Sequence, residues 1–142
     1  MEPLNVLLER IAERYGLRDV YVFGSRAKEM AARVKGISPP ETQPAADVDV
    51  AVQPRSGRVP DARDRVRLAT ELEDLFDAPR VDLVILSEAR PFLAVEVVRG
   101  ELLYTADPRA QAEHELYILR RAADLAPFQR ERVREILAGG AR

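Results

Sequence analysis

The chain has 142 residues, of which 32% are charged and 46% hydrophobic, and its formal net charge at pH 7 is −2. This composition is typical of one soluble globular domain spanning residues 1–142, and it gives no positive field that would favour nucleic-acid binding. The absence of cysteine excludes disulfides and thiolate metal sites and favours a cytoplasmic location, and no apolar run approaches the roughly 20 residues that cross a bilayer.

The first third of the chain predicts a helix, a strand and a second helix. Leu4, Leu8 and Ile11 recur at helical spacing, so residues 3–15 are predicted to form an amphipathic helix that Gly16 ends. Residues 19–23 are rich in β-branched and aromatic side chains and predict a strand, and 27–33 predict a helix.

Residues 34–46 contain three prolines and a glycine, which excludes a regular element. We expect the Pro-rich stretch 36–45 to be an exposed and weakly ordered loop.

The remaining chain alternates strands and helices before it becomes entirely helical. The predicted elements are a strand at 47–52, a helix at 61–77 capped by Asp61, a strand at 80–87, a helix at 91–99 ended by Gly100, a strand at 101–105, and a helical segment at 108–138. Pro127 is predicted to break this last segment into two helices. The order of elements predicts an α/β (α+β) fold, with a small mixed sheet flanked by helices.

The turn after the first strand is a candidate anion site. Gly24 and Ser25 follow a strand and precede a helix, which places backbone amides and a hydroxyl at a helix N-terminus. Phosphate groups bind in such places, although most Gly-Ser pairs are ordinary turns.

Three aspartates are the second candidate for chemistry. Asp47 and Asp49 are two apart on a strand, so both side chains point to one face, about 6.6 Å apart. A divalent cation such as Mg²⁺ would relieve their repulsion, and the alternative is a solvated edge strand. Asp82 stands in an apolar run, where it is either a third ligand or general base beside them, or a surface partner of Arg80.

The strings FGSRA, DVDVAV and VDLVIL together resemble the polymerase β-like nucleotidyltransferases. The chain looks closest to the minimal nucleotidyltransferases, the MNT-type antitoxins that are paired with HEPN-domain toxins. Residues 99–128 are similar to the C-terminal part of those antitoxins. The resemblance implies a polymerase β-like fold with C-terminal helices.

The resemblance also implies a role for each motif residue. Gly24 and Ser25 would hold the phosphates of a nucleotide, and Arg26 would be a further phosphate partner. The catalytic, metal-binding residues would be the three acids, Asp47, Asp49 and Asp82, with two Mg²⁺ ions as cofactors.

The implied reaction transfers AMP from ATP to a tyrosine of a cognate HEPN toxin and thereby neutralises it. Two alternatives are an antitoxin that acts by binding alone and a nucleotidyltransferase that modifies a small molecule. The chain departs from the family pattern in two places. Ser25 and Asp47 are 22 positions apart, about ten more than expected, and Lys28-Glu29 replaces the usual basic-glycine pair.

Overall fold

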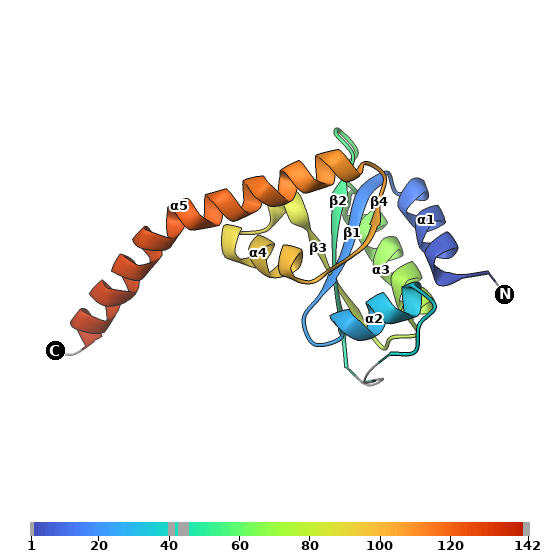
Figure 1. Ribbon diagram of the computed structural model, residues 1–142, viewed down its shortest axis with the longest axis horizontal. Coiled ribbons are helices and arrows are strands. Elements are labelled where there is room, and N and C mark those ends of the chain that lie inside the picture. Colours follow the sequence, from blue (N-terminus) through green and yellow to red (C-terminus); the bar gives the residue numbers. More distant parts are fainter. Residues whose placement is uncertain (1, 40–41, 43–45, 141–142) are drawn as a thin grey trace.

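A computed structural model of the chain describes residues 2–39, 42 and 46–140 (Figure 1). The elements in chain order are α1 (Leu4–Arg14), β1 (Leu17–Phe23), α2 (Ala27–Val34), β2 (Val48–Pro54), α3 (Ala62–Phe76), β3 (Val81–Ile85), a short 3-10 turn η1 (Leu86–Glu88), α4 (Pro91–Arg99), β4 (Glu101–Thr105) and α5 (Pro108–Gly140). Each predicted strand is present, with no end moved by more than two residues and with β4 as predicted.

The described residues form one four-stranded sheet with the order β3-β2-β1-β4. Strand β1 is antiparallel to both β2 and β4, whereas β2 and β3 are parallel. This arrangement confirms the small mixed sheet that the order of elements predicted. It also places the strands that carry the three candidate acids side by side.

Helices cover both faces of the sheet (Figure 1). On one face, side chains of α1, α2 and α3 pack against the buried valines of β1 and β2; examples are Leu8, Met30, Leu72, Val22 and Val50. On the other face, α4 and α5 pack against residues that include Tyr21, Phe23 and Ala51. Each strand therefore alternates between two apolar layers.

Helix ends follow the local sequence. Asp61 caps α3, as predicted, because its Oδ1 accepts a hydrogen bond of 2.8 Å from the amide of Asp64. Gly16 follows α1 with a φ of +66°, and Gly100 is the C-cap of α4. A Cβ on Gly100 would lie 2.4 Å from the carbonyl oxygen of Val22, so only glycine lets the α4–β4 junction pass so close to β1.

The prediction that Pro127 breaks the C-terminal segment is wrong. Helix α5 runs without interruption from Pro108 to Gly140 with Pro127 inside it, and Figure 1 shows it bending as it leaves the sheet. A proline inside a helix removes one backbone hydrogen bond and bends the helix. Good helix formers such as Ala, Leu, Arg and Glu flank it here, and they continue the helix beyond the bend.

The predicted loop at 36–45 lies partly outside the described residues, namely at 40, 41 and 43–45. The parts of 36–45 that the structure does describe belong to no helix or strand. Within the described chain, no helix combines the length and the apolar character needed to cross a membrane.

Candidate active site

The turn between β1 and α2 carries the first two candidate residues, Gly24 and Ser25. Gly24 has a φ of +77°, in the left-handed region that favours glycine. A Cβ on Gly24 would lie 2.5 Å from Oδ2 of Asp49, so any larger residue here would displace that carboxylate. The turn therefore holds its backbone against the carboxylate of Asp49.

Helix α2 starts directly after this turn. The amide of Ala27 donates to the carbonyl of Gly24 at 3.3 Å, and Arg26, the N-cap, makes no side-chain cap hydrogen bond. The amides in the first turn of α2 are thus not used by a capping side chain, and Ser25 beside them is exposed. This arrangement suits an anion such as a phosphate group.

The three candidate acids lie on neighbouring strands. Asp49 is paired in register with Phe23 of β1 on one side and with Asp82 of β3 on the other. Asp47 is exposed and precedes β2, which begins at Val48 and not at Asp47 as the sequence predicted. Because Val48 is fully buried on the opposite face, strand alternation puts Asp47 on the same face as Asp49.

The electrostatics of Asp49 follow from this crowding. Partial burial raises the pKa of Asp49 above its ordinary value, and the negative charges of Asp82 and then Asp47 raise it further. A bound cation would favour the charged form of Asp49 and oppose this shift of its pKa. The acids are therefore close enough to act on one another and have the oxygen donors that Mg²⁺ prefers.

The described residues contain no group of three or more His, Cys, Asp or Glu side chains already arranged around a metal position. Oδ1 of Asp82 lies 3.0 Å from Nη2 of Arg80. That contact is the surface pairing that the sequence left open for Asp82. Arg80 is exposed and Asp82 is partly exposed, so separating them costs little, about 1 kcal/mol or less. What supports a divalent cation here is the chemistry of the donors, because carboxylate oxygens are the ligands that Mg²⁺ prefers.

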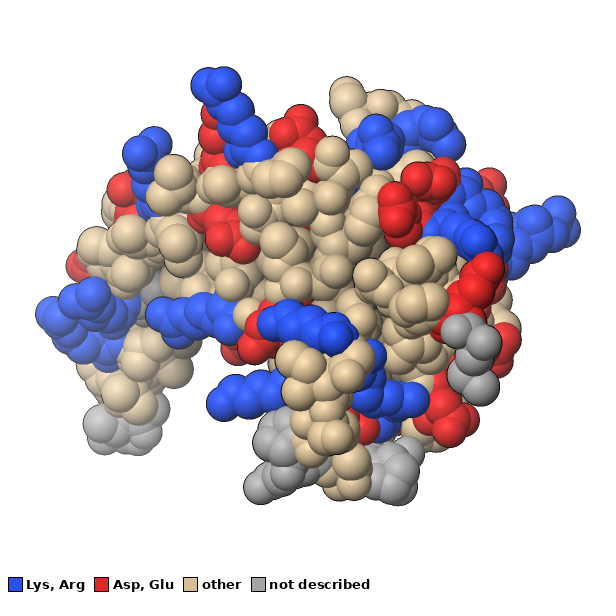
Figure 2. All heavy atoms as spheres, turned by 45° about the vertical axis from the view of Figure 1, so that its right-hand side comes forward, with Lys and Arg blue, Asp and Glu red and all other residues tan. Residues whose placement is uncertain are grey.

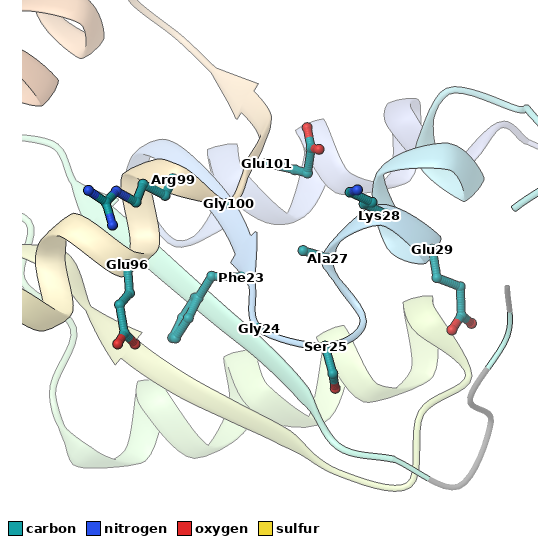
Figure 3. Close-up of a pocket in the computed structure, with 10 residues that line it drawn as sticks. All are labelled: Phe23, Gly24, Ser25, Ala27, Lys28, Glu29, Glu96, Arg99, Gly100 and Glu101. Carbon is teal, nitrogen blue, oxygen red and sulfur yellow. The ribbon is translucent and has the colours of Figure 1, made fainter. Parts of the chain in front are cut away.

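A cavity of about 740 Å³ adjoins the turn, within the range of about 300–1,000 Å³ that is usual for ligand sites. Its lining comes from the end of β1, the turn, the start of α2 and the α4–β4 junction, namely Phe23, Gly24, Ser25, Ala27, Lys28, Glu29, Glu96, Arg99, Gly100 and Glu101 (Figure 3). Gly24 borders this cavity and also touches Asp49, so it links the cavity to the acids.

Two cationic residues of this lining, Lys28 and Arg99, were not predicted as site residues. Lys28 lies in the first turn of α2, where its position after the Gly-Ser turn could have suggested a phosphate contact. Arg99 ends α4, some 75 residues further along the chain than the turn. Only the close packing of Gly100 on β1 brings it to the cavity, and no local sequence signal shows that packing.

Arg26 stands at the head of α2, as the sequence predicted, and its side chain contacts other residues of the chain. Its side chain is only 2% exposed, pairs with Glu29 at 2.7 Å and donates to the carbonyl of Ala46 at 2.8 Å. Arg26 is also not among the residues that line the cavity. The buried guanidinium ties the head of α2 to the segment before β2, and its contact with phosphate remains a prediction.

The fold and the site together define a nucleotidyltransferase. A family model described as "Polymerase beta, Nucleotidyltransferase" matches residues 7–109, and this chain belongs to that family. The match includes all six residues that the motifs singled out, and it confirms the resemblance.

Solved structures share the fold over nearly the whole chain. A chain in the crystal structure of a toxin-antitoxin with AMP-PNP has a TM-score of 0.70 and 19% identity, covering 94% of this chain and 98% of that one. A chain in the complex of a tri-AMPylated Shewanella oneidensis HEPN toxin with an MNT antitoxin has a TM-score of 0.67 and 19% identity, with coverages of 94% and 96%.

A chain in the toxin-antitoxin MntA-HepT has a TM-score of 0.66 and 18% identity, with coverages of 94% and 97%. At these identities the likeness shows the fold, which is the polymerase β-like fold that the sequence predicted. No curated protein sequence matches the chain at a significant level.

Proposed function

We propose that this chain is an antitoxin that transfers AMP from ATP to a tyrosine of a cognate HEPN-domain toxin, in a Mg²⁺-dependent reaction in the cytoplasm. The observation that carries the proposal is the contact between the Gly24–Ser25 turn and Asp49, whose carboxylate lies in register with Asp82. A phosphate-binding turn set against paired carboxylates is what phosphoryl transfer requires. The similar chains come from structures of toxin-antitoxin complexes, one of them with AMP-PNP and one with a tri-AMPylated toxin.

The binding roles divide between the turn and the acids. The hydroxyl of Ser25 and the amides at the start of α2 donate to phosphate oxygens, and Lys28 adds a positive charge in the cavity. Asp47, Asp49 and Asp82 are the residues that would hold two Mg²⁺ ions. When bound, these ions would neutralise charge on the triphosphate and on the attacking oxygen.

The reaction forms one phosphorus–oxygen bond and breaks another. The tyrosine oxygen attacks the α-phosphorus of ATP, the bond from the α-phosphorus to the bridging oxygen breaks, and pyrophosphate leaves. Asp82 accepts the proton of the tyrosine hydroxyl, and its partly exposed position lets an acceptor from another molecule reach it. The acceptor oxygen must come within about 3–3.5 Å of the phosphorus, which a docked partner can provide.

Nucleic acid is not the acceptor that we propose. Figure 2 shows acidic and basic side chains interspersed over the visible face, and the net charge of the chain is −2. A surface that binds nucleic-acid backbones gathers its positive charges into a patch or stripe.

Intact-mass spectrometry tests the proposal. The chain is incubated with the purified HEPN toxin encoded beside it, ATP and Mg²⁺, and AMP-sized mass increments are expected on the toxin. The matched control is Asp49→Asn, which removes one carboxylate charge and keeps the side-chain size. An increment that is as abundant with Asp49→Asn as with the unchanged chain would show that the site has been assigned wrongly.

One observation favours the binding-only alternative, namely the ion pair between Arg80 and Asp82. If Asp82 stayed on Arg80, the third carboxylate would not reach the nucleotide. The same mass spectra decide this point, because a toxin that is inhibited yet unmodified in the presence of ATP and Mg²⁺ supports neutralisation by binding. A toxin that stays active while a small-molecule acceptor gains AMP supports the other alternative.

A further inference from the structure

The two halves of α5 differ sharply in what covers them. In the first half, Ile118 and Ala122 are buried, and Ile118 belongs to the apolar layer that also holds Val97 of α4. In the second half the large apolar side chains are open, with Phe128 exposed by 70% and Ile136 by 63%. Figure 1 shows this second half extending away from the sheet and its covering helices.

The buried stripe of α5 continues along the exposed half. Ile118, Ala122, Leu125, Val133 and Ile136 are separated by four, three, eight and three residues, a spacing that keeps them on one face of a helix. We call the part from Leu125 onward, with Phe128 and Leu137 at its edges, the distal face. The face that packs on the domain in the first half is therefore the face that lacks a cover in the second.

We infer that the distal face docks the acceptor protein of the proposed reaction, an inference that rests on that proposed function. The first support is continuity, because a partner on this face extends the apolar layer that α4 begins. A monomeric domain rarely exposes so many large apolar side chains along one helix without a binding role. A helix that presents an apolar face of this kind commonly packs against an apolar groove or a helix of a partner.

The second support is the position of the catalytic acids relative to this layer. Asp49 is two residues from Ala51, which lies in the same apolar cluster as Ile118 of α5, so both strand residues face the α4–α5 side of the sheet. A protein seated on the distal face thus lies on the side of the sheet that carries Asp49. Helix α4, which packs beside α5, also lines the cavity through Glu96 and Arg99.

The charged residues of this half of α5 indicate the chemistry of the partner's surface. From Leu125 onward the helix has the cations Arg130, Arg132 and Arg134 and the acids Glu131 and Glu135. Three positive against two negative charges beside the exposed apolar side chains favour a partner with an apolar centre and an acidic rim. The occupant is therefore a helical surface of the acceptor protein that is rich in Leu, Ile or Val and bordered by Asp or Glu.

A charge-insertion pair tests the surface. Phe128→Glu combined with Ile136→Glu changes two exposed side chains, so the isolated chain should unfold at an unchanged temperature. Its dissociation constant for the purified HEPN toxin should rise at least about tenfold, because hot-spot apolar residues at the centre of an interface dominate affinity. The matched control is Val66→Glu, an exposed apolar residue of α3 on the other side of the sheet, which should leave the affinity unchanged.

Adding Asp49→Asn to the set separates the surface from the chemistry. We expect the Asp49→Asn chain to bind the toxin as the unchanged chain does, while failing to modify it. If the double variant binds the toxin as tightly as the unchanged chain, the docking surface is wrong and the proposed function stands. If the unchanged chain itself does not bind the toxin, both fail.

Sedimentation of the chain alone supplies the last outcome. A dimer that the Phe128→Glu and Ile136→Glu changes convert to a monomer would assign the distal face to a second copy of the chain and overturn the inference.

Discussion

The acidic side chains at the two ends of strand β1 have opposite surroundings. At its beginning, Asp19 is fully buried, and its Oδ2 lies 2.8 Å from Nη2 of Arg18 while its Oδ1 accepts a hydrogen bond of 2.7 Å from Thr105. At its end, Phe23 is paired with Asp49, whose neighbours include other carboxylates. The carboxylate of Asp19 therefore has a cation and a hydrogen-bond donor as partners, whereas that of Asp49 lies among other negative charges.

Hydrogen bonds also join β1 to helix α5. Tyr21 donates to Oε1 of Glu115 at 2.9 Å and accepts from Gln111 at 2.7 Å. Burial raises the pKa of Tyr21, so its hydroxyl stays neutral and remains a donor. These contacts fasten the first half of α5 to the sheet. The difference teaches that paired polar groups hold this fold together, whereas like charges held together against repulsion mark the site that has a ligand to bind.

The largest expected effect comes from removing the charges of the acids beside the end of β1. Asp47→Asn with Asp49→Asn should lower AMP transfer by about 10³-fold or more, because several kcal/mol of charge stabilisation in the transition state is lost. The double variant should remain folded, since these changes remove repulsion and leave the core intact. Single-turnover transfer of labelled AMP measures the rate, and circular dichroism checks the fold. Transfer within tenfold of the unchanged rate would contradict the assignment of these acids.

A change at Asp19, at the beginning of β1, should lower stability and leave activity near normal. Asp19→Asn removes the charge that Arg18 and Thr105 bind, and it should lower the free energy of unfolding by about 2–3 kcal/mol. Below the new melting temperature the rate of AMP transfer should stay near normal, because Asp19 lies far from the turn along β1. Urea titration measures the stability. A stable Asp19→Asn chain that has lost its activity would remove the distinction between the two ends.

Much of this comparison could be predicted from local sequence. The strands, the Asp61 cap and the shared face of Asp47 and Asp49 follow from alternation and capping rules that involve only neighbours in the chain. The sequence left two places open for Asp82, one beside Asp47 and Asp49 and one on Arg80, and its register pairing with Asp49 could not be predicted because register between strands depends on tertiary structure. For the same reason the contacts of Arg26 with Glu29 and Ala46 could not be predicted, since the helix position of a cation does not show which groups will bind it.

A smaller effect on stability is expected when the charge of Asp49 alone is removed. Asp49→Asn should raise the free energy of unfolding at pH 7 by a few tenths to about 1 kcal/mol, as removal of facing like charges does. The folded state raises the pKa of Asp49, so the folded chain binds its proton more readily than the unfolded chain. Above the ordinary value of 3.8 the charged carboxyl therefore costs stability, and this cost fades as pH falls toward that value.

Melting temperatures of both chains, with and without Mg²⁺, measure this effect. Mg²⁺ should stabilise the unchanged chain more than the Asp49→Asn chain. Equal stabilisation of the two would contradict a role for Asp49 in holding the ion.

The smallest expected effect concerns His114 of α5, which contacts Arg18 at the beginning of β1. Its Nδ1 lies 3.0 Å from Nη2 of Arg18, so the neutral ring accepts a hydrogen bond from the guanidinium. Burial lowers the pKa of His114, the charge of Arg18 lowers it further, and Asp19 and Glu115 oppose the shift. The unfolded chain therefore takes up a proton near pH 6.5 while the folded chain resists it, and stability should fall as the pH decreases below about 6.5. His114→Gln keeps an acceptor for Arg18 but cannot titrate, so its free energy of unfolding should depend less on pH between 7 and 5 than that of the unchanged chain. Urea titrations across this range measure both slopes, and identical slopes would show that His114 does not couple the docking of α5 to pH.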